Sequence, residues 1–462
     1  MDLDFLIINI GNTELFKLAP EFLNKGYKVG IISGSPRHFK DNEDIQKNVP
    51  FWHINDIITH YKNEIKYDDD TLNKIKQDFN IQSFHNFYFP HMFYRNQYCG
   101  HNDFYKLSNN SENEILFKKT IETFQAIKFF FKDNNIKCTI QNLGGEILRR
   151  VIFFHNQKYD IPHIFVEASP VPEHFVILSD ENGLWDELEI KNYNELSKSA
   201  INNSLEFIEE FKNKKTVVKL KDNQKALNHE KIINFITNKK NRLSMSTDYI
   251  KKLKKRAQIS RFYNEPDLNE KFIYFPLHYH IESRLTLRDP HCWRQEFIVE
   301  YVARSIPQGY KLYVKPHPEW PLDFPYEGLK LISEISNVKL INPFYNSINL
   351  IKKSNAVVVI NSTAGLEAII YKKPVITFGT EYYNESNLTY KVDNLRKLPE
   401  IINNALKNRL NSKDLICFVD AFLKANRKGD LYNLDQDNIL FVEELLDYIS
   451  TNYPKKSSDN VP

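Results

Sequence analysis

Cysteine is scarce in this chain of 462 residues, which contains only Cys99, Cys138, Cys292 and Cys417. The four are widely spaced and form no pair at the short spacing that zinc sites use. This scarcity argues against a fold held together by disulfides. The thiols are expected to stay reduced, as they are in cytosolic proteins.

Long apolar runs and an excess of charge of one sign are also missing. No apolar stretch approaches the roughly 18 residues of a membrane-spanning helix, and Asp2 and Asp4 stand where a secretory signal would be basic. The 62 basic and 59 acidic residues give a formal net charge of +3. That balance argues against a nucleic-acid-binding protein, which would carry a basic excess. We expect a cytoplasmic protein, long enough for two domains with separate cores.

The most informative segment is AVVVINSTAGLEAIIYKKPVITF, residues 356–378. Its pattern predicts a strand, a turn, a helix and a second strand of a parallel sheet. Asn361, Ser362 and Thr363 form the turn, where free backbone N–H groups at a helix start favour a phosphate. Glu367, one turn into the helix, is placed to accept hydrogen bonds from ribose or sugar hydroxyls. The alternative is an ordinary N-cap by Ser or Thr, although Glu367 stands too far along to complete a capping box.

A histidine follows a second expected strand, Lys311–Lys315. His317 stands between Pro316 and Pro318, which restrict the backbone on both sides of it. In open α/β sheets, ligands bind at the carboxyl ends of the strands. We therefore expect His317 either to contact a phosphate or to be an exposed residue of a rigid turn, with Lys315 adjacent to it.

A third strand is expected at the start of FIYFPLHYHIE, residues 272–282, and His278, His280 and Glu282 follow it. The H-x-H-x-E pattern suits zinc in the chemistry of its ligands. The same alternation is also typical of an extended loop that crosses a cleft. Because no further Cys or His pair supports a metal site, we expect a loop that faces the substrate and no metal cofactor.

Together and in this order, FPLHYHIE, YVKPHPEW and VVVINSTAGLEAIIYKKPVITFG resemble the capsule polysaccharide biosynthesis proteins. That family includes the bacterial Kdo transferases, which use CMP-activated 3-deoxy-manno-octulosonic acid. Its hallmarks are a His-Pro pair, here His317-Pro318, and an Asn-Ser-(Ser/Thr)-x-Gly-Leu-Glu-Ala motif, here residues 361–368. The strongest match covers about residues 270–385. The resemblance implies a GT-B-like α/β fold with two Rossmann-like domains that face a central cleft, the C-terminal one holding a nucleotide sugar.

The N-terminal half predicts a βαβ unit from its own pattern, with a strand at 5–10, a helix at 15–23 and a strand at 27–33. Its first turn contains a glycine but not G-x-G-x-x-G, so no dinucleotide site is predicted. The resemblance implies that this domain meets the acceptor.

IKCTIQNLGGEILRR, residues 136–150, predicts a strand end, a Gly-Gly turn and a helix start. Some Kdo transferases carry an acidic residue in a Glu-Asp-Gly-Phe-(Leu/Ile)-Arg-Ser segment of this kind. If the Ile-Leu-Arg-Arg part is aligned with it, the aspartate position falls on Gly145, one residue before Glu146. Glu146 is either a catalytic base or nucleophile, or a carboxylate that stabilises the helix dipole. Arg149 and Arg150 are expected either to be solvated or to bind the carboxylate of an acidic sugar.

The domain limits follow from composition. We expect an acceptor domain at 1–246, a nucleotide-sugar domain at 247–430, and at 431–462 a helix that returns to the first domain, by resemblance, and a disordered tail. A polar, lysine-rich linker occupies residues 212–246, and a charge run at 251–256 is either a solvated helix face or a loose attachment to anionic lipid.

The sequence thus indicates a glycosyltransferase of bacterial capsule or surface polysaccharide synthesis. The donor would be a nucleotide sugar, with CMP-Kdo or a related acidic sugar as first choice, and the acceptor a glycan or lipid-linked glycan. The protein could associate with the cytoplasmic face of the inner membrane or a capsule assembly complex. The alternatives are a glycerophosphotransferase that uses a CDP-activated donor, a sugar-nucleotide 2-epimerase and a non-catalytic subunit that binds sugar nucleotides.

Overall fold

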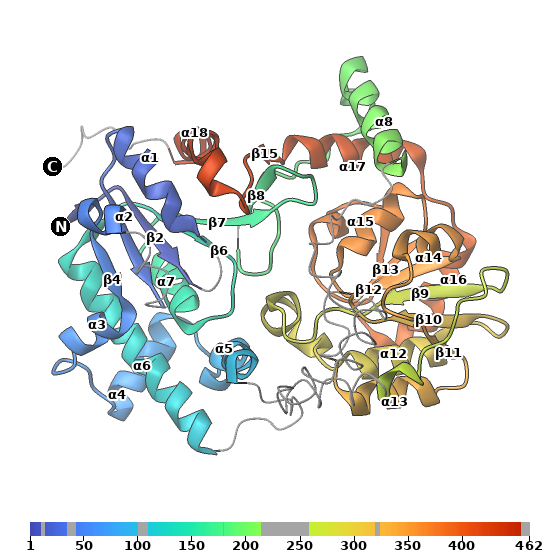
Figure 1. Ribbon diagram of the computed structural model, residues 1–462, viewed down its shortest axis with the longest axis horizontal. Helices are drawn as coiled ribbons and strands as arrows, with labels where there is room; N and C mark the ends of the chain where they lie inside the picture. The colour runs from blue at the N-terminus through green and yellow to red at the C-terminus, as the bar shows by residue number, and fades with distance from the viewer. Residues whose placement is uncertain are drawn as a thin grey trace, which may run out of the picture. The chain divides into compact units, whose positions relative to one another are not determined.

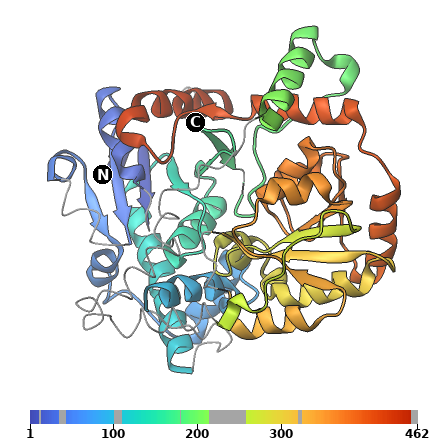
Figure 2. The same cartoon turned by 45° about the vertical axis from the view of Figure 1, so that its right-hand side comes forward.

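The computed structural model describes residues 1–10, 14–34, 43–99, 110–178, 180–213, 258–318 and 324–453. Residues 214–246 of the expected linker, the charge run at 251–256 and the tail from 454 lie outside this part. The chain divides into two compact units, which Figures 1 and 2 show in colours that follow the sequence. The first unit consists of Met1–Gly100, Tyr105–Glu189 and Lys424–Pro462, and the second unit, where described, lies within Ile190–Leu423.

This division differs from the predicted limits at residues 246 and 430 because helix α8 (Lys198–Asn213) packs within the second unit. The Tyr371 hydroxyl donates to the Lys212 carbonyl at 3.4 Å. The Phe207 ring lies against the Phe422 ring, with their centroids 5.8 Å apart. The segment from Lys424 onward belongs to the first unit.

The first unit is built on a seven-stranded sheet in the order β15-β8-β7-β6-β2-β3-β4. Its strands are β2 (Phe5–Asn9), β3 (Val29–Ser33), β4 (Phe51–His53), β6 (Thr139–Asn142), β7 (His163–Ala168), β8 (His174–Leu178) and β15 (Arg427–Lys428). β8 runs antiparallel to β7 and to β15, and the other pairs are parallel. β2 and β3 are continuous apolar runs, which suits strands covered on both faces. The chain order of the parallel strands, 3-2-1-4-5, is that of a Rossmann-like sheet.

Helices cover this sheet. They are η1 (Leu15–Leu18), α1 (Ala19–Asn24), α2 (Glu43–Asn48), α3 (Ile54–His60), α4 (Asp69–Asp78), α5 (Phe84–Cys99), α6 (Asn110–Asp133), α7 (Ile147–Lys158) and α18 (Leu434–Asn452). The short strands β1 (Asp2–Leu3) and β5 (Asn135–Ile136) form a separate pair. Figures 1 and 2 show α18, in red, beside α1, in blue, and Lys17 Nζ holds Asp435 of α18 at 2.6 Å.

The second unit is built on a six-stranded, wholly parallel sheet in the order β11-β10-β9-β12-β13-β14. The strands are β9 (Phe272–Pro276), β10 (Lys311–Lys315), β11 (Val338–Leu340), β12 (Ala356–Val359), β13 (Val375–Thr377) and β14 (Thr389–Lys391). In chain order this is 3-2-1-4-5-6, the order of a doubly wound Rossmann sheet. The predicted α/β class with two Rossmann-like domains is confirmed, while the cleft between them stays a prediction.

Helices pack on both faces of the second sheet. Figure 1 shows α12 and α13 on one side of the strands and α14 and α15 on the other. The full set is η3 (Tyr193–Glu195), α8, a π-helical turn η5 (Arg284–Arg288), η6 (Pro290–Cys292), α12 (Gln295–Ser305), α13 (Tyr326–Glu334), α14 (Ser347–Lys353), α15 (Thr363–Ile370), η7 (Tyr382–Glu385), η8 (Leu395–Lys397), α16 (Leu398–Lys407) and α17 (Ser412–Lys424). In the described part of the chain, no helix combines the length and apolar character that crossing a bilayer requires.

Candidate functional site

The topology of the second sheet singles out one edge as a binding site. β9 and β12 are neighbours, and they are the first and fourth strands of the sheet in chain order. The connections leave in opposite directions at this point, and in open α/β sheets ligands bind outside the carboxyl ends of the strands at such a point. The segments that carry His278, His317 and Asn361 begin at this edge. Leu277 N donates to the Lys315 carbonyl at 2.8 Å, and Asn361 N donates to His278 Nε2 at 3.5 Å.

The predicted turn at the start of α15 is present, with Ser362 as the N-cap of the helix. The Ser362 hydroxyl accepts a hydrogen bond from Ala364 N at 3.2 Å, so the capping alternative is realised. The Tyr383 hydroxyl donates to the Ser362 carbonyl at 2.9 Å. A Cβ on Gly365 would come within 2.6 Å of the Tyr383 ring, so glycine permits this close approach. Thr363 is exposed. Tyr383 thus fixes the position of the turn, and phosphate binding to the turn stays a prediction.

Asn361, a predicted ligand-binding residue, is fully buried and anchors this turn. Its side-chain Nδ2 donates to the Arg284 carbonyl at 2.7 Å and to Asp289 Oδ2 at 2.6 Å. Its main-chain carbonyl accepts from Arg284 at 3.3 Å. The structure therefore uses Asn361 to tie the end of β12 to the loop that follows β9.

Sequence reasoning missed the charged groups that surround Asn361. Glu381 is almost fully buried, with Arg284 at 2.9 Å and Arg288 at 3.7 Å. Asp289 accepts a hydrogen bond from Thr380 N at 3.1 Å. Burial raises the pKa of the Asp289 carboxyl, although its hydrogen bonds and neighbouring positive groups oppose the rise. The one local signal in the sequence was the run Arg-Leu-Thr-Leu-Arg-Asp, residues 284–289. The π-helical turn η5 brings its charged residues together.

The three residues of the H-x-H-x-E pattern do not converge. His278 Nδ1 and Glu282 Oε1 form a hydrogen bond. His280 instead packs against Trp293 and Phe324, where burial lowers its pKa to about 3. No group of three potential metal-ligating side chains occurs in the ranges that the structure covers.

Lys315 and Glu367 form an electrostatically coupled pair behind the same edge. Lys315 is buried, and its ammonium donates to the Pro343 carbonyl at 2.9 Å. Burial lowers the pKa of Lys315 to about 8, against the opposing charge of Glu367. Burial likewise raises the pKa of Glu367 to about 7, against the charge of Lys315. Glu367 keeps part of its surface exposed.

The first unit holds the other predicted site residues, Glu146, Arg149 and Arg150. Arg149 is buried and donates to Glu146 Oε2 at 2.9 Å. Its other terminal nitrogen donates to the Ile10 carbonyl at 2.7 Å and to Asn142 Oδ1 at 2.8 Å, which joins the ends of β2 and β6. Neither arginine is solvated, because Arg150 forms a two-pronged ion pair with Glu181 at 2.7 and 3.0 Å.

The Glu146–Arg149 ion pair yields a prediction that distinguishes a structural role of Glu146 from a catalytic one. Breaking a buried ion pair by removing one partner typically costs about 3–5 kcal/mol. We expect Glu146→Gln and Arg149→Met each to lower the unfolding free energy by about that amount, and the double variant to lose less than the sum. Chemical denaturation measures all three, with Glu181→Gln as the control. A fully stable Glu146→Gln protein with strongly reduced turnover would instead identify a catalytic carboxylate.

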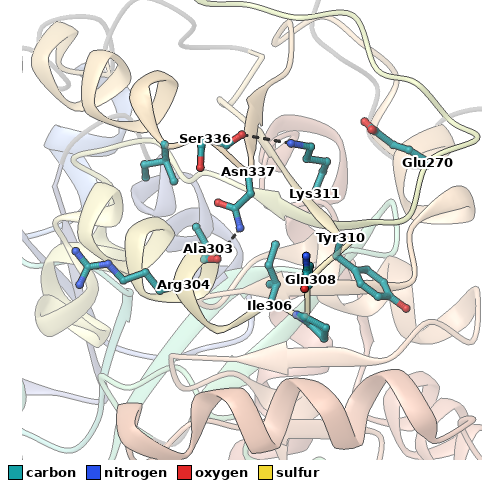
Figure 3. A pocket seen from close by; sticks show the side chains of 12 residues that line it. Glu270, Ala303, Arg304, Ile306, Gln308, Tyr310, Lys311, Ser336 and Asn337 are labelled. Atoms are coloured by element: carbon teal, nitrogen blue, oxygen red, sulfur yellow. Dashed lines mark hydrogen bonds between the residues drawn. The ribbon is translucent and has the colours of Figure 1, made fainter.

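A cavity of about 500 Å³ lies at the opposite edge of the second sheet (Figure 3). Its lining includes Glu270, Lys311 and Asn337, which stand at or just before the amino-terminal ends of β9, β10 and β11. Lys311 Nζ donates to the Ser336 carbonyl at 3.3 Å, and Asn337 Nδ2 donates to the Ala303 carbonyl at 2.7 Å. These donors are used within the protein, and ligands of parallel sheets bind at the other edge. The cavity is therefore not the candidate site.

Comparison with known protein families gives one match, which lies within the second unit. Residues 199–405 match a protein family described as capsule polysaccharide biosynthesis protein. No curated protein sequence matches the chain.

Among solved structures, the chain is similar to the KpsC beta Kdo 2,7 transferase of Thermosulfurimonas dismutans, at 14% identity and a TM-score of 0.36, over 68% of this chain and 88% of that one. It is also similar to the UDP-GlcNAc 2-epimerase of Methanocaldococcus jannaschii in complex with UDP-GlcNAc and UDP, at 13% and 0.31, over 90% and 97%. The UDP-GlcNAc-bound 2-epimerase of Neisseria meningitidis gives 13% and 0.31, over 97% and 100%. Similarities this distant do not indicate what the present chain binds.

Proposed function

Since residues 199–405 match the capsule polysaccharide biosynthesis family, we propose that this protein is a glycosyltransferase that uses a nucleotide sugar in bacterial capsule or surface polysaccharide synthesis. The observation that carries the proposal is the shared edge of the second sheet, where the His317 segment follows β10 and the Ser362-Thr363 turn with Glu367 follows β12, the two strands that flank β9. The donor we favour is CMP-Kdo or a related acidic sugar on CMP.

The chemistry at this edge would centre on the leaving phosphate. When the bond from the sugar carbon to the phosphate oxygen breaks, its electron pair stays with the nucleotide, so negative charge develops there. Backbone N–H groups and the dipole at the start of α15 favour that charge. A protonated His317 would donate to the same phosphate. Glu367 would hold the ribose or sugar through hydroxyl hydrogen bonds.

The surroundings of Lys315 support a donor with one phosphate. A diphosphate would need further cationic or N–H partners, and Lys315 is the basic residue adjacent to the His317 segment. Its ammonium is buried and already donates to the Pro343 carbonyl. The turn at 361–365 contains one glycine, which makes it a poorer cradle than the glycine-rich loops that bind diphosphates.

In the same proposal, the first unit meets the acceptor, a glycan or lipid-linked glycan, at the cytoplasmic face of the inner membrane. Glu146 is the acidic residue that the sequence singles out there as base or nucleophile. Its ion pair with Arg149 favours a structural role. Both arginines already have protein partners, so we do not assign them to the acidic sugar.

The nucleotide can be tested by thermal unfolding of the full-length protein with CMP, CDP, UDP or GDP. A ligand at 100 times its dissociation constant adds about 2.7 kcal/mol to the stability of the folded state, so CMP is expected to raise the Tm. UDP and GDP are expected to leave it unchanged. Protection by CDP alone would favour a glycerophosphotransferase. Protection by UDP alone would overturn the Kdo-like donor and leave the fold untouched.

A further inference from the structure

Glu282 holds one imidazole of the candidate site in a defined state. His278 has a side chain only 5% exposed, and its Nδ1 is hydrogen-bonded to the Glu282 carboxylate. The other ring nitrogen, Nε2, accepts from Asn361 N at 3.5 Å. A ring nitrogen that accepts carries no proton, so the neutral His278 has its proton on Nδ1 and donates it to Glu282.

The second imidazole, His317, reaches the same place from the neighbouring strand. Lys315 pairs with Pro276 in the parallel register of β10 and β9, and Leu277 N donates to the Lys315 carbonyl at 2.8 Å. His317 is two residues beyond Lys315, as His278 is two residues beyond Pro276. The two histidines therefore follow adjacent strands at equivalent positions.

The electrostatics of Glu282 agree with this placement. Burial raises the pKa of its carboxyl, but the hydrogen bond with His278 and the positive charges of Arg284 and His317 oppose burial, and the pKa is lowered overall. The Glu282 side chain is 30% exposed, so it is partly accessible at this edge of the sheet. Opposite charges favour the ionised form of each partner, so the same attraction favours the imidazolium form of His317.

We propose that Glu282 is a positioning residue shared by two histidines, which fixes the proton of His278 on Nδ1 and keeps His317 cationic near neutral pH. The site then presents a positive imidazole to an anionic group of the ligand, a phosphate in the first instance. The identity of that ligand rests on the proposed function, whereas the charge state of His317 can be measured without any ligand.

The test is a pH titration of the histidine ring signals by NMR in the unliganded full-length protein, with the His317 signal assigned from a His317→Asn variant. The midpoint of His317 in the unaltered protein is expected above the ordinary value of about 6.5. A midpoint at or below that value overturns the proposal, whatever the behaviour of the variants.

Variants then separate the two contacts of Glu282. Glu282→Gln is expected to lower the His317 midpoint by about one pH unit. Glu334→Gln removes the same charge from α13, where Glu334 is 60% exposed beside Lys330, and is expected to leave the midpoint unchanged. His278→Gln keeps the charge of Glu282, so the His317 midpoint should stay high. Equal midpoints in the Glu282→Gln and Glu334→Gln proteins overturn the proposal.

Binding of inorganic phosphate provides a second readout that needs no turnover. At a pH about one unit or more above both midpoints, phosphate is expected to bind up to about tenfold more weakly to Glu282→Gln than to the unaltered protein, because a shift of one pH unit there changes the protonated fraction of His317 about tenfold. If CMP fails to raise the Tm while the His317 midpoint is high and falls in Glu282→Gln as expected, only the proposed donor is refuted. If CMP raises the Tm while the His317 midpoint is the same in the unaltered and Glu282→Gln proteins, only the role of Glu282 is refuted.

Discussion

His317→Ala is expected to lower turnover of the nucleotide sugar about 100-fold or more, the effect of removing one preorganised donor from developing negative charge. The expectation follows from its position. His317 lies two residues beyond the end of β10, and His278 lies two residues beyond the end of the neighbouring strand β9, at the edge where the phosphate would lie. Because the imidazole would act on the leaving group, kcat should fall more than KM rises.

The matched control is His60→Ala, which removes an exposed histidine on α3 in the first unit. Steady-state kinetics with saturating acceptor compare the two variants, and circular dichroism establishes that both are folded. Near-normal turnover in a folded His317→Ala protein would reduce His317 to a residue of a rigid turn.

Glu367→Gln is expected to weaken nucleotide binding by about 10- to 100-fold, because a hydrogen bond to a charged group contributes about 1.5–3 kcal/mol. A ligand that lacks the ribose hydroxyls provides the control. Isothermal titration calorimetry should show a large loss for CMP and a small loss for its 2′,3′-dideoxy form. Equal losses for both ligands would contradict the hydroxyl contact.

The same carboxyl predicts a pH dependence. Burial raises the pKa of Glu367 to about 7, so below that pH a proton occupies the acceptor and above it the carboxylate is free to accept hydroxyl hydrogen bonds. The ratio of the CMP affinity of the unaltered protein to that of Glu367→Gln should therefore rise between about pH 6 and pH 8, a comparison in which the titration of His317 cancels. The positive charge of Lys315 lowers the pKa of Glu367, so Lys315→Met should move the rise to higher pH.

Much of the second unit could be predicted because its strands are short apolar runs that end at distinctive turn residues. β10 was predicted at its observed limits, and the two strands expected within residues 356–378 are present as β12 and β13. Strand ends in a parallel sheet lie at one edge, so the motifs after β9, β10 and β12 were expected together. The prediction for the first unit located β2, β3 and α7 for the same reason.

The charged interior of the site could not be predicted, since its partners are distant in the chain. Arg284 and Glu381 are 97 positions apart, and no local pattern links them. Asn361 was expected to meet the ligand, yet its side chain is directed to Arg284 and Asp289. Arg149 and Glu146 are three residues apart, a spacing that allows an ion pair on a helix, but their burial depends on the ends of β2 and β6. In each case tertiary packing decides which polar group is free to bind a ligand.

The central claim is that this chain transfers a sugar from a nucleotide to an acceptor. The most direct measurement is mass spectrometry of the products after incubation with CMP-Kdo, with and without a glycan or lipid-linked glycan. Rapid release of CMP together with a sugar-extended acceptor, and only slow release of CMP without acceptor, is the predicted result. Conversion of a nucleotide sugar to its epimer with the nucleotide still attached would contradict the account.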